Sequence, residues 1–140
     1  ENGISAVVEP KLLPASAPEA AVPTNYNRIS LVAERLGPAS FFGQGAGRFP
    51  TGFNVVQDCI DIFGGCRNFY NDKAEPASVS NDKVMRAYYL RTEKPELFSD
   101  ITVGSMGPGL ITKPIAVSAL YERAADCQFL ASLPQNFGKE

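Results

Sequence analysis

A glycine-rich stretch at residues 43–47, Gly-Gln-Gly-Ala-Gly, constrains this chain more than any other feature. Residues 39–42 before it have the composition of a strand, and residues 51–63 after it have the pattern of a helix. Glycine lets a backbone turn tightly and lets a ligand approach main-chain N–H groups. The N-terminus of the following helix adds a partial positive charge. The stretch is therefore a candidate nucleotide-binding loop.

Spacing alone leaves two interpretations of this loop open, a structural turn and a ligand contact. The dinucleotide fingerprint places a third glycine where this chain has Arg48, and an acidic residue at the end of a second strand. Asp61 stands near that distance, but it falls inside the predicted helix. The phosphate-binding pattern of P-loop proteins is absent, because no Gly-Lys-Ser/Thr follows the loop.

The rest of the chain predicts an α+β fold, a mixed sheet with a hairpin and one glycine-loop helix, followed by a small βα unit. Residues 4–13 and 85–92 are expected to be strands, and residues 116–126 a helix. A predicted strand at 27–34 begins a hairpin that turns at Gly37-Pro38. The helix after the glycine loop is expected to begin at Pro50 or Thr51 and to end at Gly64-Gly65, and a last strand is expected at 129–133.

Composition excludes several classes of protein. The chain has 140 residues, a formal net charge of −2 and no histidine. Without a basic patch nothing favours nucleic acid or an anionic membrane, and no apolar run approaches the roughly 18 residues of a membrane span. The absence of histidine removes a Ser-His-Asp unit, and the three cysteines have no metal-ligand spacing, so no metal site is predicted. The start at Glu1 lacks a signal peptide and suggests a cut within a longer chain.

Residues 8–62 contain an ordered series of short motifs. These are Val8-Glu9-Pro10-Lys11-Leu12-Leu13-Pro14, Asn27, Gly43-Gln44-Gly45-Ala46-Gly47, Pro50-Thr51 and Val55-Val56-Gln57-Asp58. The series resembles the homoserine dehydrogenase family. That family has, in the same order, a V-x-P-x-L-L-P strand, a segment ending in Asn-Ala, a strand, Gly-x-Gly-Ala-Gly, Pro-Thr, and a helix with Val-Val-x-Asp.

The resemblance implies a fragment of an NAD(P)-dependent enzyme that interconverts L-homoserine and L-aspartate 4-semialdehyde in threonine and methionine biosynthesis. It implies NADP or NAD as cofactor, with Gly47 at the place where the family's backbone touches it and Gly45 and Ala46 flanking that contact. The family's lysine and acidic catalytic residues lie upstream, so no catalytic residue is assigned here. The isolated chain is then expected to be inactive. It is also expected to be cytoplasmic, and to associate with the remainder of its subunit and with further copies.

In the C-terminal part, Tyr88-Tyr89-Leu90-Arg91 is followed by Lys94-Pro95 and then by Glu96. These residues resemble the first strand and turn of a reduced ACT unit, a small amino-acid-sensing module, in which a glycine normally stands where this chain has Glu96. Adjacent strand residues point to opposite faces, so one of Tyr88 and Tyr89 is expected in the core. The predicted division is residues 1–70 for the catalytic region, 71–82 for a linker and 83–140 for the ACT-like unit. The alternative function is a non-catalytic amino-acid-binding or assembly module derived from that family.

Overall fold

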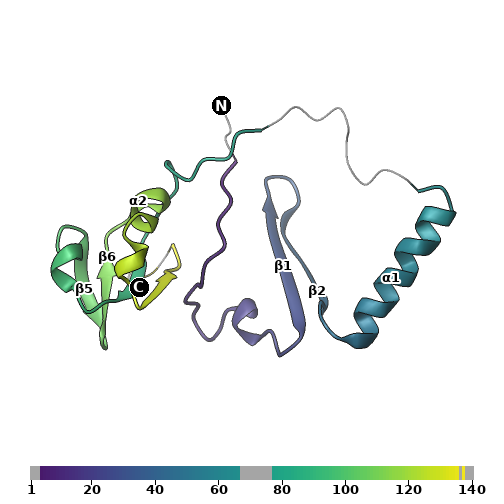
Figure 1. Cartoon of the computed structure of the whole chain (residues 1–140), viewed down its shortest axis with the longest axis horizontal. Helices are drawn as coiled ribbons and strands as arrows, with labels where there is room; N and C mark the ends of the chain where they lie inside the picture. Colours follow the sequence, from purple (N-terminus) through teal and green to yellow (C-terminus); the bar gives the residue numbers. More distant parts are fainter. Residues whose placement is uncertain (1–3, 67–76, 136, 138–140) are drawn as a thin grey trace. The chain divides into compact units, whose positions relative to one another are not determined.

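The computed structural model describes residues 4–66, 77–135 and 137, and it divides the chain into two compact units (Figure 1). The glycine-loop unit is residues 14–74. The C-terminal unit combines residues 75–140 with residues 1–13. This division differs from the predicted boundary, because residues 10–12 hydrogen-bond to a strand near the C-terminus (Leu12 N–H to Ser132 O, 2.9 Å). Part of the predicted linker at 71–82 lies outside the described residues.

The glycine-loop unit begins with a short 3₁₀ turn, η1 (Pro18–Ala21), followed by the predicted hairpin. Strands β1 (Tyr26–Ala33) and β2 (Gly37–Gln44) pair antiparallel, from Tyr26 opposite Gln44 to Ala33 opposite Gly37. The turn is residues 34–36, just before the predicted Gly37-Pro38. Gly37 has φ +72°, the conformation that ends a three-residue hairpin loop and that glycine adopts without strain.

Helix α1 (Arg48–Phe63) follows the glycine loop and starts three residues before the predicted Thr51. The earlier start is possible because Pro50 falls in the first turn, where a missing N–H costs no helical bond. The predicted stop at the glycine pair is confirmed. Gly65 has φ +84°, and the bonds from Gly65 N–H to Ile62 O (3.0 Å) and from Cys66 N–H to Asp61 O (2.8 Å) form a Schellman motif.

The C-terminal unit has a four-stranded sheet in the order β5-β6-β4-β8. Each neighbouring pair is antiparallel, and among the described residues parallel pairing occurs only at two isolated bridges, Ile4–Val79 and Lys11–Ser132. The predicted mixed sheet with the hairpin is wrong, because β1 and β2 form a two-stranded antiparallel sheet of their own. Residues 4–13 are extended and meet the unit at those bridges, although they form no continuous strand. The strands are β4 (Tyr88–Arg91), β5 (Thr102–Met106), β6 (Gly109–Thr112) and β8 (Phe129–Ser132).

Short helical segments connect these strands in the order expected for a split β-α-β fold. A 3₁₀ turn stands between β4 and β5, and α2 with a further 3₁₀ turn stands between β6 and β8. The predicted helix at 116–126 is broken at Arg123, whose guanidinium donates to both carboxylate oxygens of Asp100 (2.8 and 3.1 Å). These segments are η2 (Pro95–Phe98), α2 (Val117–Tyr121) and η3 (Ala124–Asp126). The identity of this unit as ACT-like stays a prediction.

The core of the C-terminal unit lies between the sheet and these helical segments. Its buried members are Tyr88, Leu90, Phe98, Ile101, Val117 and Leu120. Tyr89, on the opposite face of β4, packs edge-on against Phe129 with ring centroids 6.1 Å apart. Tyr88 therefore confirms the expectation that one tyrosine of the pair is in the core, and Tyr89 is buried as well, at 9% exposure.

The predicted strand at 85–92 is two strands. β3 (Met85–Arg86) pairs with β7 (Ile115–Ala116), and β4 begins after Ala87 and pairs with β6 and β8. The change of partner at Ala87 explains the break, because one extended run of residues serves two different sheets. The observed combination of helices and antiparallel sheets is an α+β fold, as predicted. Among the helices that the structure describes, none has the length and apolar character that a membrane crossing needs.

Candidate functional site

The glycine loop is closed by the residue that precedes β1. The N–H groups of Gly45 and Ala46 both donate to the carbonyl oxygen of Asn25, at 3.0 and 3.3 Å. The Asn25 side-chain amide donates in return to the carbonyl oxygen of Ala46 (2.9 Å). The loop therefore continues the ladder of the hairpin by one step. Its conformation is set before any ligand binds, because these backbone donors already have protein partners.

Gly45 and Gly47 are glycines for different physical reasons. A Cβ at position 45 would lie 1.6 Å from the Asn27 side-chain nitrogen, so Asn27 packs directly on this backbone. A Cβ at position 47 would meet Asn25 and Pro50 only at 3.5 Å, an ordinary contact. Gly47 instead has φ +123°, a backbone conformation that side-chain-bearing residues rarely adopt. A side chain at 45 would therefore displace the exposed Asn27 side chain, whereas at 47 it is the backbone conformation that favours glycine.

The first turn of α1 offers backbone donors next to Gly47. Gly47 is the N-cap, and its carbonyl oxygen accepts the N–H of Thr51 (3.0 Å). The first N–H groups of a helix have no partner within the helix, and Pro50 has none to offer. The groups that remain belong to Arg48 and Phe49, at the end of the helix where the dipole favours negative charge. This place suits a phosphate or a carboxamide oxygen.

The side chain of Arg48 lies over the ring of Phe49, with 5.3 Å between the guanidinium carbon and the ring centroid. Such a stack holds the guanidinium next to the glycine loop. Among the described ion pairs, none gives Arg48 an acidic partner. A phosphate contact and a solvated or acid-paired side chain are the alternatives for Arg48. The stack is compatible with either one.

A polar contact holds η1 against the hairpin. The Ser30 hydroxyl donates to the Glu19 carboxylate (2.6 Å), and the Arg28 guanidinium lies 3.4 Å from the same oxygen. The hydrogen bond from Ser30, helped by a backbone bond and by the charge of Arg28, holds the pKa of Glu19 below its usual range. These contacts therefore hold η1 against β1, the strand that follows Asn25.

The glycine-loop unit leaves large apolar side chains exposed. None of its described residues is buried, and α1 itself buries none. Phe53 and Ile60 on α1 are 69% and 57% exposed, and Phe41 on the hairpin is 66% exposed. Monomeric proteins rarely expose contiguous apolar surface on this scale, and when they do it usually contacts another protein surface. Further exposed members are Ile29, Val32, Phe42, Phe49, Val55, Val56, Ile62 and Phe63.

Sequence reasoning missed a buried acidic residue in the C-terminal unit, Glu9. Its side chain is only 5% exposed and forms an ion pair with Arg86. The hydroxyls of Tyr88 (3.1 Å) and Tyr121 (3.3 Å) donate to its other oxygen. The signal in the sequence is a single carboxylate between Val8 and Pro10, in a run whose other polar residues are Ser5 and Lys11.

The partners of Glu9 decide its charge. Burial raises the pKa of Glu9, but the nearby Ser132 hydroxyl, the hydrogen bonds from Arg86 and Tyr88 and the charge of Arg86 outweigh burial and leave the pKa below its usual range. The Ser132 hydroxyl lies beside the carboxylate, but without a hydrogen bond of good geometry among the described residues. Burial and the charge of Glu9 raise the pKa of Tyr88, so its hydroxyl stays a donor.

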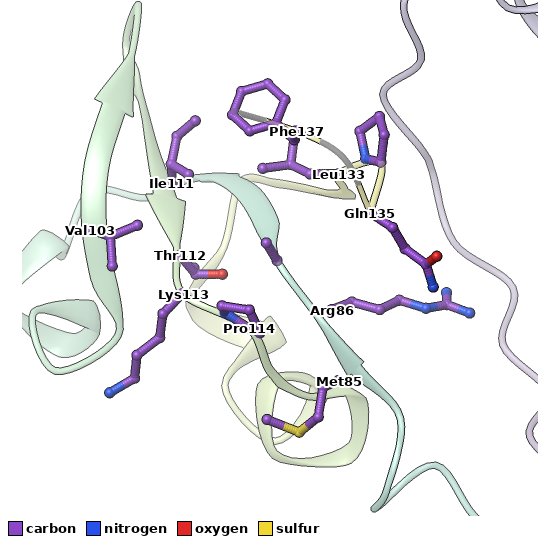
Figure 2. Close-up of a pocket in the computed structure, with 12 residues that line it drawn as sticks. Met85, Arg86, Val103, Ile111, Thr112, Lys113, Pro114, Leu133, Gln135 and Phe137 are labelled. Atoms are coloured by element: carbon purple, nitrogen blue, oxygen red, sulfur yellow. The ribbon is translucent and has the colours of Figure 1, made fainter. Parts of the chain in front are cut away.

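A hollow of about 500 Å³ lies on the C-terminal unit beside β6 (Figure 2). Its walls are mostly apolar and include Val103, Ile111, Leu133 and Phe137. Figure 2 shows the Lys113 amine extending away from Leu133 and Phe137. A ligand site needs a few polar groups that converge on the ligand, but two polar residues of this lining already have protein partners: Arg86 pairs with Glu9, and the Thr112 hydroxyl accepts the Tyr88 N–H (2.9 Å). The described residues also contain no group of three or more His, Cys, Asp or Glu placed to hold a metal ion.

Comparisons with known proteins give the same family name by sequence and by structure. A profile of the family described as homoserine dehydrogenase matches residues 2–60. The homoserine dehydrogenase of Lactococcus lactis is 33% identical over 102 residues, which are 69% of this chain and 24% of that protein. A protein from Pseudomonas canavaninivorans named NAD(+)-dependent homoserine dehydrogenase is 40% identical over 62 residues, 44% of this chain and 18% of that protein.

The fold has a similar relative among solved structures. A crystal structure of a homoserine dehydrogenase from Thiobacillus denitrificans covers 96% of this chain with a TM-score of 0.62. The sequence identity is 22%, and this chain covers 40% of that one. The matched proteins are all oxidoreductases that act as dehydrogenases by name. The chain belongs to the homoserine dehydrogenase family, and it spans about a quarter of the length of the Lactococcus lactis relative.

Proposed function

We propose that this chain is the C-terminal part of a cytoplasmic homoserine dehydrogenase. The parent would interconvert L-homoserine and L-aspartate 4-semialdehyde with NADP or NAD as cofactor. The cofactor would supply the hydride chemistry when bound, and the protein would position it. The observation that carries the proposal is the conformation of Gly47, with φ +123°, at the start of a helix inside the matched residues 2–60.

The residues of the loop have separate roles in this proposal. Gly47 allows the cofactor to approach the backbone, and the N–H groups of Arg48 and Phe49 face that approach. Gly45 and Ala46 shape the loop, because their own N–H groups bind Asn25. No residue of this chain is assigned to proton transfer. The isolated chain is therefore expected to show no homoserine-dependent reduction of NAD or NADP above a contaminating background.

The exposed apolar surface of the glycine-loop unit supports the proposed partner, which is the remainder of the same subunit. Ile60 and Phe53 would be covered by that remainder, and the parent would assemble as a homo-oligomer. Steady turnover of homoserine by the 140-residue chain alone would contradict this assignment, because the proposed catalytic residues lie outside it.

A paired substitution in the parent tests the role of Gly47. Gly47→Val should raise the Michaelis constant for NAD(P)H by roughly tenfold or more, equivalent to about 1.4 kcal/mol. The branched side chain would occupy the space where the cofactor approaches, and the backbone conformation adds about 1–2 kcal/mol of strain. Gly47→Ala is the milder control at the same φ. A Val variant that melts much earlier but keeps a normal cofactor constant would show that Gly47 is only a turn residue.

A second candidate function rests on the C-terminal unit, which has its own buried core and the strand order of a split β-α-β fold. In this alternative the chain is a non-catalytic module that binds an amino acid or supports assembly. Calorimetric titration of the chain with L-threonine, L-methionine and L-homoserine distinguishes the two. Saturable binding to this chain without dehydrogenase activity in the parent would favour the alternative.

A further inference from the structure

The C-terminal unit holds residues 4–13 along their whole length. The backbone of Ile4 bonds to Ser78 and Ser80, with Ser80 N–H donating to Ile4 O at 2.9 Å. The side chain of Asn81 donates to the carbonyl oxygen of Ala6 (3.0 Å), and Val7 packs against the hydrophobic core. Val7 and Glu9 turn their side chains into the unit, while Val8 between them is 99% exposed, as expected for an extended peptide whose successive residues face opposite sides.

The far end of this segment completes the edge of the sheet. Leu12 N–H donates to Ser132 O (2.9 Å), and Ser132 N–H donates to Pro10 O (3.0 Å). β8 pairs with β4 on its other side, so residues 10–12 occupy the edge that β8 would otherwise leave open. Pairing of an extended peptide with a free sheet edge is a general mode of peptide recognition, in which backbone bonds give affinity and side-chain pockets give specificity.

The side-chain pocket belongs to Glu9. Its carboxylate is bound by groups from three elements: Arg86 of β3, Tyr88 of β4 and Tyr121 of α2. A buried carboxylate is strongly disfavoured unless it is paired and hydrogen-bonded, and this pocket supplies one cation and two hydroxyls. An apolar or amide side chain at the same place would leave Arg86 without its partner.

We propose that the C-terminal unit contains a strand-binding groove that recognises residues 7–12 as an extended peptide, with Glu9 as its specificity-determining residue. The groove consists of the β8 edge and the pocket formed by Arg86, Tyr88 and Tyr121. Its ligand is the chain's own segment, which continues directly into Pro14 and the glycine-loop unit. By binding residues 7–12, the groove fixes on the C-terminal unit the point from which the chain continues to Asn25. This inference is independent of the proposed reaction.

Hydrogen exchange on the complete 140-residue chain tests the recognition in place. Glu9→Gln should speed exchange of the Leu12 and Ser132 amides by at least about tenfold, because both depend on the seated segment. Exchange in β6 should change by less than about twofold. Glu34→Gln makes the same change of charge in the exposed turn of the hairpin and should leave all of these amides unchanged. An unchanged Leu12 amide, or a uniform rise across β4, β6 and β8, would overturn the proposal.

A peptide experiment asks whether the groove acts as a binding site. The Leu12→Pro chain lacks the N–H that donates to Ser132, so its own segment should leave the groove. A labelled peptide of residues 4–14 should then bind it in a fluorescence anisotropy titration, and the same peptide with Glu9→Gln should bind at least about tenfold more weakly. Equal binding of the two peptides, or no binding to a variant whose β6 amides remain protected, would contradict the proposal. If the variant does not fold, the exchange experiment decides alone.

Discussion

The two units of this chain bury their apolar residues to very different extents. The C-terminal unit closes a core around Tyr88, Leu90 and Phe98, each with 0% exposure. The glycine-loop unit has a well-formed hairpin and a helix with a complete C-terminal cap, but none of its described residues is buried. Local sequence signals are therefore sufficient to specify the hairpin and the helix of the glycine-loop unit. They do not provide the tertiary burial that usually stabilises a helix.

The difference shows where each unit's stability originates. An isolated helix of about 12–15 residues is marginal in water even with favourable composition, and α1 has 16 residues. The sheet of the C-terminal unit gains from packing against α2 and η2, and from the segment bound at its edge. We therefore expect equivalent substitutions in the two units to lower the free energy of unfolding by very different amounts.

The largest expected difference is between Leu90→Ala and Ile60→Ala. Leu90 is fully buried, so its truncation should lower the free energy of unfolding by about 2–5 kcal/mol through lost burial and a residual cavity. Ile60 is 57% exposed, so the same kind of change should cost within about 0.5 kcal/mol in this chain. Urea denaturation followed by tyrosine near-ultraviolet circular dichroism measures both. Comparable costs would show that α1 packs on something in the isolated chain.

A glycine pair sharpens the comparison within the sheet. A Cβ at Gly109 would lie 2.2 Å from the ring of Tyr89, whereas a Cβ at Gly104 would meet nothing within 4 Å. Gly109→Ala should therefore destabilise the C-terminal unit by about 1–3 kcal/mol, because the ring must move out of its packed position. Gly104→Ala, on the neighbouring strand, should be neutral or slightly stabilising. Equal melting temperatures for the two variants would mean that Tyr89 is not held across Gly109.

Acid should weaken the C-terminal unit through Glu9. The pKa of Glu9 in the folded chain lies below its usual range, so its contribution is complete above the unfolded value near pH 4.3. This contribution is lost as pH falls through the lower folded pKa. The stability difference between wild type and Glu9→Gln should be on the order of 1 kcal/mol at pH 7 and shrink below about pH 4. A difference that stays constant from pH 7 to pH 3 would contradict the assigned charge.

Prediction from the sequence was most successful where a local rule determines the structure. The Gly64-Gly65 stop, the hairpin and the assignment of Tyr88 or Tyr89 to the core all follow from backbone geometry or from the two-residue period of a strand. The start of α1 was placed too late because Pro50 is acceptable in a first turn as well as before one.

Features that depend on distant partners could not be predicted. The sequence predicts a strand at 4–13, but the segment forms only two isolated bridges, and the partners, Val79 and Ser132, lie far away in sequence. The pocket of Glu9 could not be predicted for the same reason, because its partners come from β3, β4 and α2, far from Glu9 in the sequence. At the candidate site, the sequence identified Gly45, Ala46 and Gly47. It did not reveal that Asn25 takes up two of the loop's N–H groups.

Hydrogen exchange of the whole chain tests the central claim, that only the C-terminal unit is stabilised by its own core. Amides in β4 should exchange with the full free energy of unfolding, while those in the middle of α1 should exchange at least about a thousandfold faster. In a longer parent protein that covers Ile60 and Phe53, the α1 amides should become protected. Protection of α1 equal to that of β4 in the isolated 140-residue chain would contradict the account.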